Sequence, residues 1–141
     1  MLLNTGAKTV IDRHTIEENN DRVLLKERWA GVIDTVGGSI LSNALKATQY
    51  GGTVTCCGNV ASHNFSSSIY PFILRGITLF GIDSVKCPMD IRQMIWEHLS
   101  SDWKPEDLMQ NVNEISLEEL DKEIDRILSG QHTGRTIVNL E

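Results

Sequence analysis

Short apolar runs alternate along the chain with segments in which apolar residues recur at helical spacing. One continuous run, residues 29–36, reads WAGVIDTV and is followed by Gly37 and Gly38. A strand that is apolar on both faces is typical of a sheet covered by helices on both sides. The same patterning predicts further strands at residues 9–12, 53–58, 77–83 and 136–140. This alternation is typical of an open parallel α/β sheet.

Helices are predicted between these strands. Residues 1–7 read as the last turn of a helix with a glycine stop, and residues 14–28 indicate only a weak helix or a loop. Ser39 is expected to cap a helix. The apolar face of that helix consists of Ile40, Leu41, Ala44, Leu45 and Thr48. Residues 50–52 are expected to end it, and a short helix is predicted over residues 71–75.

Two further helices are predicted in the last third of the chain. Pro88 is expected to open the first, because its fixed φ and missing N–H suit the first helical turn. The apolar stripe of this helix consists of Ile91, Met94, Ile95, His98 and Leu99. After a break at residues 102–105, the sequence SLEE at residues 116–119 predicts a capping box. Gly130 is expected to close the helix that follows.

The composition is typical of a soluble globular protein. The chain has 141 residues, enough for one domain, with 40% apolar and 23% charged residues. Its net charge of −6 argues against nucleic acid or an anionic membrane as a partner, because both require clustered Lys and Arg. The longest apolar region, residues 69–82, is interrupted by Pro71 and Arg75 and cannot span a bilayer. No signal peptide is evident, because Lys8, Asp12 and Arg13 interrupt the N-terminal region before any apolar stretch develops. A reducing cytoplasmic location is expected by default, since the cysteine usage suggests no disulfide framework.

Residue spacing excludes several chemistries. The four histidines, His14, His63, His98 and His132, are scattered without partners at ligand spacing, so no metal site is predicted. The three cysteines, Cys56, Cys57 and Cys87, suggest neither a disulfide framework nor a metal spacing. Cys57 could be a reactive thiol, but a small buried apolar role is favoured because no nearby cation would lower its pKa. The serines at 62 and 66–68 lack a G-x-S-x-G context, which argues against a serine hydrolase.

Candidate ligand contacts gather at the predicted carboxyl edge of the sheet, where open α/β folds bind their ligands. Residues 34–38, 57–59 and 83–84, and residues 12–13 at the end of the first predicted strand, fall there. The alternative is that these are ordinary turns, in which Gly and Asp are favoured. The G-x-G-x-x-G turn of dinucleotide-binding folds does not occur in the sequence.

Seven segments have the order and spacing found in one enzyme family, over almost the whole chain. They are WAGVIDTVG (29–37), YGG (50–52), PFILRG (71–76), GIDSV (81–85), CPMD (87–90), EISL (114–117) and GRTIV (134–138). In these segments the chain resembles the YhdH/YhfP-type quinone oxidoreductases. That group is a zinc-free branch of the medium-chain dehydrogenase/reductase superfamily and includes NADPH-dependent acrylyl-CoA reductases.

The resemblance implies a partial Rossmann fold, with parallel strands three to six and flanking helices, plus a C-terminal return helix and strand. Residues 1–100 would be the C-terminal part of the nucleotide-binding domain, and residues 101–141 would return to the catalytic domain. The GroES-like domain and the glycine-rich turn would lie outside the chain. The implied chemistry is hydride transfer from NADPH to an enone, quinone or enoyl thioester, a small-molecule substrate, without a metal.

The resemblance also implies a cofactor site. Thr35, Val36 and Gly37 would line the nicotinamide ribose, Cys57 and Gly58 would pass the ring, and Ile82, Asp83 and Ser84 would approach its carboxamide. Arg135 would reach the pyrophosphate; the alternative is a surface arginine on an edge strand. No catalytic residue is assigned in this chain, because the proton donor and most substrate contacts are expected outside it.

Two other interpretations remain open. The chain could be a module without catalysis that oligomerises or binds a partner, or a partner chain could supply the remaining part of an enzyme. In the strand order 3-2-1-4-5-6, removing the first two strands exposes the edge of residues 29–36. A homodimer or larger assembly through that edge, or through a swapped N-terminal segment, is therefore expected. The isolated chain is expected to bind NADPH weakly or not at all, because the phosphate-binding turn lies outside it.

Overall fold

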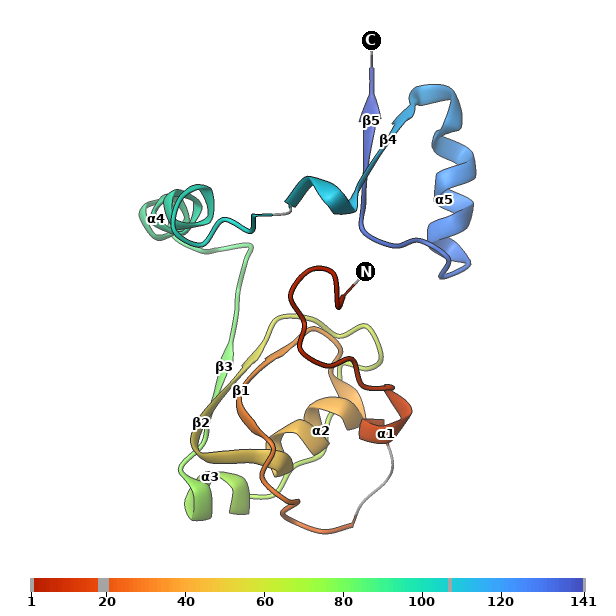
Figure 1. The fold of residues 1–141 in the computed structure, drawn as a ribbon. Helices are drawn as coiled ribbons and strands as arrows, with labels where there is room; N and C mark the ends of the chain where they lie inside the picture. The colour runs from red at the N-terminus through yellow and green to blue at the C-terminus, as the bar shows by residue number, and fades with distance from the viewer. Residues whose placement is uncertain (1, 18–20, 107, 141) are drawn as a thin grey trace. The chain divides into compact units, whose positions relative to one another are not determined.

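The computed structural model describes residues 2–17, 21–106 and 108–140. The chain forms two compact units, which are described separately below and labelled in Figure 1. The larger comprises Ile11–Pro88, and the smaller comprises Met1–Val10 together with Met89–Glu141. This division falls earlier than the boundary expected at residue 100. The assignment of residues 1–100 and 101–141 to parts of a larger enzyme stays a prediction.

The larger unit contains a three-stranded parallel sheet in the order β1-β2-β3. The strands are β1 (Trp29–Asp34), β2 (Thr48–Cys56) and β3 (Thr78–Gly81). In the register of the sheet, Asp34 lies beside Cys56, and Cys56 lies beside Gly81. All three strands therefore end in one row, as predicted for a parallel sheet.

The strand predicted at residues 9–12 is wrong. These residues are irregular and lead into the short helix α1 (His14–Glu17). Within the described residues, the sheet ends at β1 and no strand is available to pair with them. A four-residue β-branched run without a neighbouring strand has no ladder to join, so its strand propensity is not realised.

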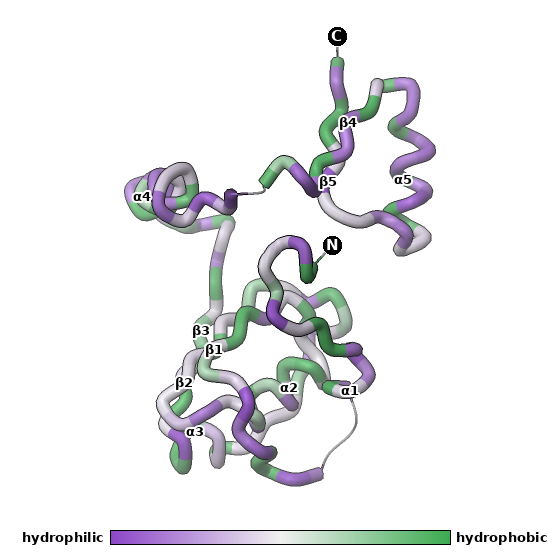
Figure 2. The backbone as a smooth tube through the Cα atoms, in the orientation of Figure 1, coloured by the Kyte–Doolittle hydropathy of each residue, from purple (hydrophilic) through white to green (hydrophobic). Residues whose placement is uncertain are grey.

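Helix α2 (Gly38–Ala47) supplies one half of the core. Leu41 and Leu45 on the helix are fully buried against Val54 of β2 and Ile77 before β3. Hydrophobic and hydrophilic residues both occur along α2 in Figure 2. Burying four such side chains contributes about 1.5–3 kcal/mol each, which makes this contact the main support of the larger unit.

Both predicted ends of α2 are corrected by the structure. Its N-cap is Gly37, not Ser39, and Gly37 has a φ of 72°, a conformation that favours glycine. Thr48, predicted on the helix face, is instead the first residue of β2, which begins five residues before the predicted strand. The Thr48 hydroxyl donates to the carbonyl oxygen of Ala44 at 2.8 Å, so the side chain closes the helix although its backbone is extended.

The sheet is covered by a helix on one face, and the prediction that β1 is buried on both faces is wrong. Val32 packs toward the core under α2, whereas Ile33 on the opposite face is 82% exposed. Phe80 lies in the same row of the sheet as Ile33 and is 52% exposed. The apolar pattern of β1 is thus that of a central strand, while its position is that of an edge strand.

Arg75 connects three segments of the larger unit from the end of α3 (Tyr70–Arg75). Its guanidinium donates to the carbonyl oxygens of Lys46 at 2.7 Å, Thr48 at 3.1 Å and Leu25 at 2.6 Å. It also lies 3.3 Å from the carboxylate of Glu27. A cation at the last carbonyls of α2 satisfies acceptors that the helix leaves open.

The smaller unit is built around a parallel pair of strands, β4 (Val112–Ser116) and β5 (Arg135–Asn139). The sequence predicted β5 within one residue but missed β4, in which apolar and polar residues are mixed. The remaining elements are α4 (Met89–Ser100), the 3-10 turns η1 (Leu108–Asn111) and η2 (Leu117–Glu119), and α5 (Leu120–Leu128). The predicted capping box before α5 is confirmed, and hydrophobic and hydrophilic residues alternate along α5 in Figure 2.

A buried carboxylate joins α5 to β5. Glu123 is 5% exposed and lies 2.8 Å from His132 Nδ1, while the Thr136 hydroxyl donates to it at 2.9 Å. Arg126 donates to the other oxygen at 2.9 Å. These hydrogen bonds, led by the one to His132, hold the pKa of Glu123 below its usual value. A full set of partners is what a carboxylate needs to remain charged in this position.

Candidate functional site

The predicted site residues of the larger unit gather at the carboxyl edge of the sheet. The N–H of Cys57 donates to the Asp34 carbonyl at 2.9 Å, and the N–H of Ile82 donates to the Cys56 carbonyl at 2.9 Å. The ladder therefore continues just past the ends of the strands. Eight predicted residues follow the strand ends here: Thr35, Val36, Gly37, Cys57, Gly58, Ile82, Asp83 and Ser84.

The turn after β1 is fixed by Asp34. This side chain is 4% exposed, and its carboxylate accepts the N–H of Gly37 at 2.9 Å. Gly37 then bridges to Ser62, and the Val36 carbonyl accepts the N–H of Ala61 at 2.9 Å. From the sequence, Asp34 is predicted only to lie at a strand end, with no role of its own. The sequence feature that could have indicated this role is the position of a single acidic residue at the end of an apolar strand.

Close backbone packing explains two of the predicted glycines. A Cβ on Gly58 would overlap the carbonyl oxygen of Thr35, and one on Gly37 would overlap the carbonyl oxygen of Ser62. Both positions are therefore required by the fold itself. Substituting either of them would disturb the turn in addition to any effect on a ligand.

Exposed side chains remain for a ligand to contact. Thr35, Ile82 and Asp83 are exposed, and the carboxylate of Asp83 is held by its own loop, accepting the N–H of Val85 at 2.8 Å. Cys57 is exposed and not buried, and its thiol donates to the Asp34 carbonyl at 3.3 Å. The edge thus offers an exposed hydroxyl, thiol, apolar side chain and carboxylate.

Arg135 belongs to the smaller unit and is exposed at the start of β5. It lines a hollow of about 560 Å³ together with residues of the N-terminal turn and η1, among them Thr5 and Leu108. Arg135 and the strand ends of β1, β2 and β3 belong to different units, which are described separately, so the structure does not bring them together. The role predicted for Arg135 stays a prediction.

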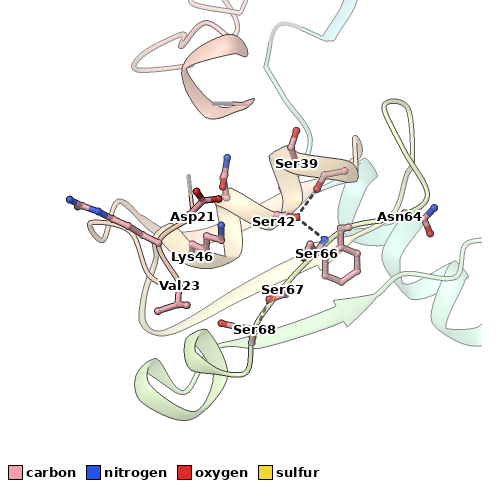
Figure 3. A pocket seen from close by; sticks show the side chains of 13 residues that line it. Asp21, Val23, Ser39, Ser42, Lys46, Asn64, Ser66, Ser67 and Ser68 are labelled. Atoms are coloured by element: carbon pink, nitrogen blue, oxygen red, sulfur yellow. Dashed lines mark hydrogen bonds between the residues drawn. The ribbon is translucent and has the colours of Figure 1, made fainter. Parts of the chain in front are cut away.

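Hollows also lie on the described part of the larger unit. One of about 230 Å³ runs along β1 and includes Thr35 and Val36. Another, of about 620 Å³, lies outside α2 and contains none of the predicted site residues. Figure 3 shows its serine-rich lining, in which Ser42 accepts the N–H of Ser66 at 3.1 Å.

In the part of the chain that the structure describes, no three His, Cys, Asp or Glu side chains come together in a way that could hold a metal ion. No helix there is both long enough and apolar enough to cross a membrane.

The comparisons with known proteins agree on one family. The family profile described as zinc-binding dehydrogenase matches residues 1–101. The putative quinone oxidoreductase YhfP of Bacillus subtilis is 44% identical over 140 residues, which are 99% of this chain and 42% of the relative. The probable acrylyl-CoA reductase AcuI of Escherichia coli is 37% identical over 139 residues, with the same shares of 99% and 42%.

Solved structures give the same result. The crystal structure of Bacillus subtilis YhfP with NAD bound has a TM-score of 0.90 at 42% identity, covering 99% of this chain and 44% of that one. Escherichia coli YhdH with bound NADPH has a TM-score of 0.88 at 38% identity, covering 99% and 43%.

The parallel strands with flanking helices match the Rossmann-like, NAD(P)-binding domain of these structures. The chain belongs to the zinc-binding dehydrogenase family. It resembles the quinone oxidoreductase and acrylyl-CoA reductase members, and it spans less than half of the length of those curated relatives.

Proposed function

We propose that this chain is the nicotinamide side of an NADPH-dependent oxidoreductase that transfers hydride to an enone, quinone or enoyl thioester. The main support is the alignment of 99% of the chain with a relative crystallised with NAD bound, at a TM-score of 0.90. The row of strand ends at Asp34, Cys56 and Gly81 agrees with this proposal. Open parallel sheets bind their ligands at such an edge.

The residues of this edge fit a bound nicotinamide nucleotide. Thr35, Val36 and Gly37 would line its ribose, in a turn whose Gly37 N–H is bound by the Asp34 carboxylate. In the proposal, the remaining contacts come from Cys57, Gly58, Ile82, Asp83 and Ser84 around the ring, and from Arg135 at the pyrophosphate. The cofactor would supply the hydride, and this chain would orient it.

The proposal assigns the chain a part of the reaction. The curated relatives extend well beyond the 42% that aligns with this chain, and we propose that their remaining length supplies the phosphate-binding turn, the substrate contacts and the proton donor. The chain corresponds in this view to residues 1–100 of a nucleotide-binding part and residues 101–141 of a return segment. No residue of this chain is proposed as a catalytic acid or base.

A graft tests the proposal. The corresponding segment of Bacillus subtilis YhfP is replaced by this chain, and NADPH oxidation is followed with a quinone and with acrylyl-CoA as alternative acceptors. The expected result is acceptor-dependent oxidation of NADPH with at least one acceptor. A graft that folds, as judged by circular dichroism, and oxidises NADPH with neither acceptor would overturn the proposal.

The alternative function is a module that binds a partner without catalysis. It is favoured by one observation, the exposed edge and outer face of β1, where Ile33 is 82% exposed. The graft separates the two functions, because a chain that has lost its cofactor contacts would leave the grafted enzyme folded and inactive.

A further inference from the structure

Arg135 lies between two residues that are both connected to one buried carboxylate. It is the first residue of β5, between Gly134 and Thr136. The Thr136 hydroxyl donates to Glu123 Oε1 at 2.9 Å, and the same oxygen lies 2.8 Å from His132 Nδ1. The other ring nitrogen of His132 lies 3.0 Å from the Gly134 carbonyl oxygen. The backbone on both sides of Arg135 is therefore linked to Glu123 of α5.

The same three residues are also held from the β4 side. Arg135 is aligned with Val112 in the register of β4 and β5. Gly134 has a φ of 88°, and a Cβ there would overlap the carbonyl oxygen of Asn111, the last residue of η1. The backbone of residues 134–136 therefore has close neighbours in η1, β4 and α5 within the smaller unit.

The Arg135 side chain extends from this fixed backbone and is exposed beside the hollow of about 560 Å³. A long side chain loses rotamer freedom when it binds a ligand, and this loss opposes binding. Fixing the backbone in advance limits the cost of ordering to the side chain itself. A binding group is also placed more precisely when hydrogen bonds support the residues around it.

We propose that Glu123 is a positioning residue, which holds the start of β5 so that Arg135 is placed for the pyrophosphate of NADPH. This inference rests on the proposed function, in which Arg135 contacts that pyrophosphate. Glu123 is 5% exposed, and its two oxygens have different partners. Oε1 is shared by His132 and Thr136, whereas Oε2 accepts the Arg126 guanidinium from its own helix at 2.9 Å. Glu123 acts through Arg135 and is not a catalytic residue.

Substitutions of Thr136 test the inference in the graft of this chain into Bacillus subtilis YhfP. Thr136→Val keeps the shape of the side chain but removes the hydroxyl that donates to Glu123. It is expected to raise the KM and the Kd for NADPH about fivefold, because a displaced binding group loses affinity steeply. The kcat at saturating NADPH is expected to change less than about twofold, because Arg135 is assigned to binding and not to the chemical step.

Two control variants separate the contact to β5 from the carboxylate as a whole. Thr136→Ser keeps the hydroxyl and is expected to hold the KM for NADPH within about twofold of the unsubstituted graft. Arg126→Gln removes the partner of Oε2 and leaves both Oε1 contacts in place, so it is expected to leave the affinity for NADPH unchanged. A rise of the KM in either control equal to that in Thr136→Val would overturn the inference.

A role of Glu123 in stability alone predicts a different result. Loss of folded protein lowers the apparent kcat and leaves the KM for NADPH unchanged. That pattern in Thr136→Val would overturn the inference. A double-substitution cycle gives the second criterion. In an Arg135→Ala background, Thr136→Val is expected to raise the KM no further, and an additional rise of about fivefold would show that the effect does not act through Arg135.

Calorimetric titration with NADPH distinguishes failure of this inference from failure of the proposed function, because it measures affinity without turnover. A folded graft whose affinity is unaffected by Thr136→Val overturns this inference alone. A folded graft that binds NADPH but oxidises it with neither acceptor overturns the proposed reaction, and the Thr136→Val titration still tests the positioning role. A folded graft that does not bind NADPH overturns both. If Thr136→Val fails to fold, Glu123→Gln is titrated in its place, with the same expected loss of affinity.

Discussion

Replacing Arg75 tests how the larger unit holds together. The Arg75 side chain is 13% exposed and donates to three backbone carbonyls, those of Leu25, Lys46 and Thr48, at 2.6–3.1 Å. Thr48 is fully buried, so water cannot take over at its carbonyl. A hydrogen bond to a charged group contributes about 1.5–3 kcal/mol, and such bonds to one group do not add fully. We expect Arg75→Met, which keeps an apolar stem, to cost about 3–5 kcal/mol.

The ion pair to Glu27 is expected to contribute little by comparison. Glu27 is 46% exposed, so solvent screens it, and Glu27→Gln should cost at most about 1 kcal/mol. Arg75→Lys keeps the charge but loses the fork of donors, and should fall between these variants. The order of the three stability losses distinguishes the contribution of the carbonyl hydrogen bonds from that of the Arg75–Glu27 ion pair.

Urea unfolding at one fixed protein concentration measures these differences. Fluorescence of Trp29, with the other two tryptophans replaced by phenylalanine, reports on the larger unit. With a slope of about 2 kcal/mol per M, a loss of 3 kcal/mol lowers the midpoint by about 1.5 M. An Arg75→Met midpoint within about 0.3 M of the parent, or a larger loss for Glu27→Gln than for Arg75→Met, would refute the reasoning.

Three further predictions follow from particular contacts. Gly58→Val should lower the free energy of unfolding in urea by about 1–3 kcal/mol even without cofactor, because a Cβ at this position meets the Thr35 carbonyl. Gly81→Ala should be nearly neutral, because the space around Gly81 is open, and equal effects of the two substitutions would contradict this reasoning. Glu123 has a lowered pKa, so its contribution to stability is present above its ordinary value of 4.5 and is lost as the pH falls through the folded value. Glu123→Gln should therefore weaken the loss of stability on acidification from pH 7 to 3 in urea unfolding, and an unchanged pH profile would count against the His132 contact. In the graft, Arg135→Ala should weaken NADPH binding by about 1–3 kcal/mol if its charge-assisted contact is real, and an unchanged Michaelis constant would identify a surface arginine.

The positions of the strands in the larger unit were predictable where apolar runs were bounded by glycine. Residues 29–36 contain all of β1, and residues 53–58 contain the last four residues of β2, because a parallel strand needs a continuous apolar run. The pattern could not tell which faces are covered. Burial on the second face of β1 depends on neighbours that the described sheet does not contain, and Ile33 is exposed as a result.

Contacts between distant segments could not be predicted either. The sequence places Arg75 in the PFILRG segment and as a break in an apolar region, but it does not indicate its carbonyl partners, which lie 27–50 residues away. The strand β4 forms by pairing with β5, and its own mixture of apolar and polar residues does not predict a strand. The strand ends of the candidate site were predictable, because parallel strands finish at one edge. Gly37 and Gly58 at these strand ends are also needed because the neighbouring backbone leaves no space for a Cβ, which the sequence does not reveal.

Calorimetric titration with NADPH tests the central claim most directly, when it is performed on the isolated chain and on the graft side by side. The account predicts a dissociation constant near a micromolar for the graft, about −8 kcal/mol, because the graft combines both sides of the cofactor site. It predicts binding at least a hundredfold weaker for the isolated chain, which lacks a glycine-rich phosphate turn. Micromolar binding by the isolated chain, or no binding by a folded graft, would contradict it.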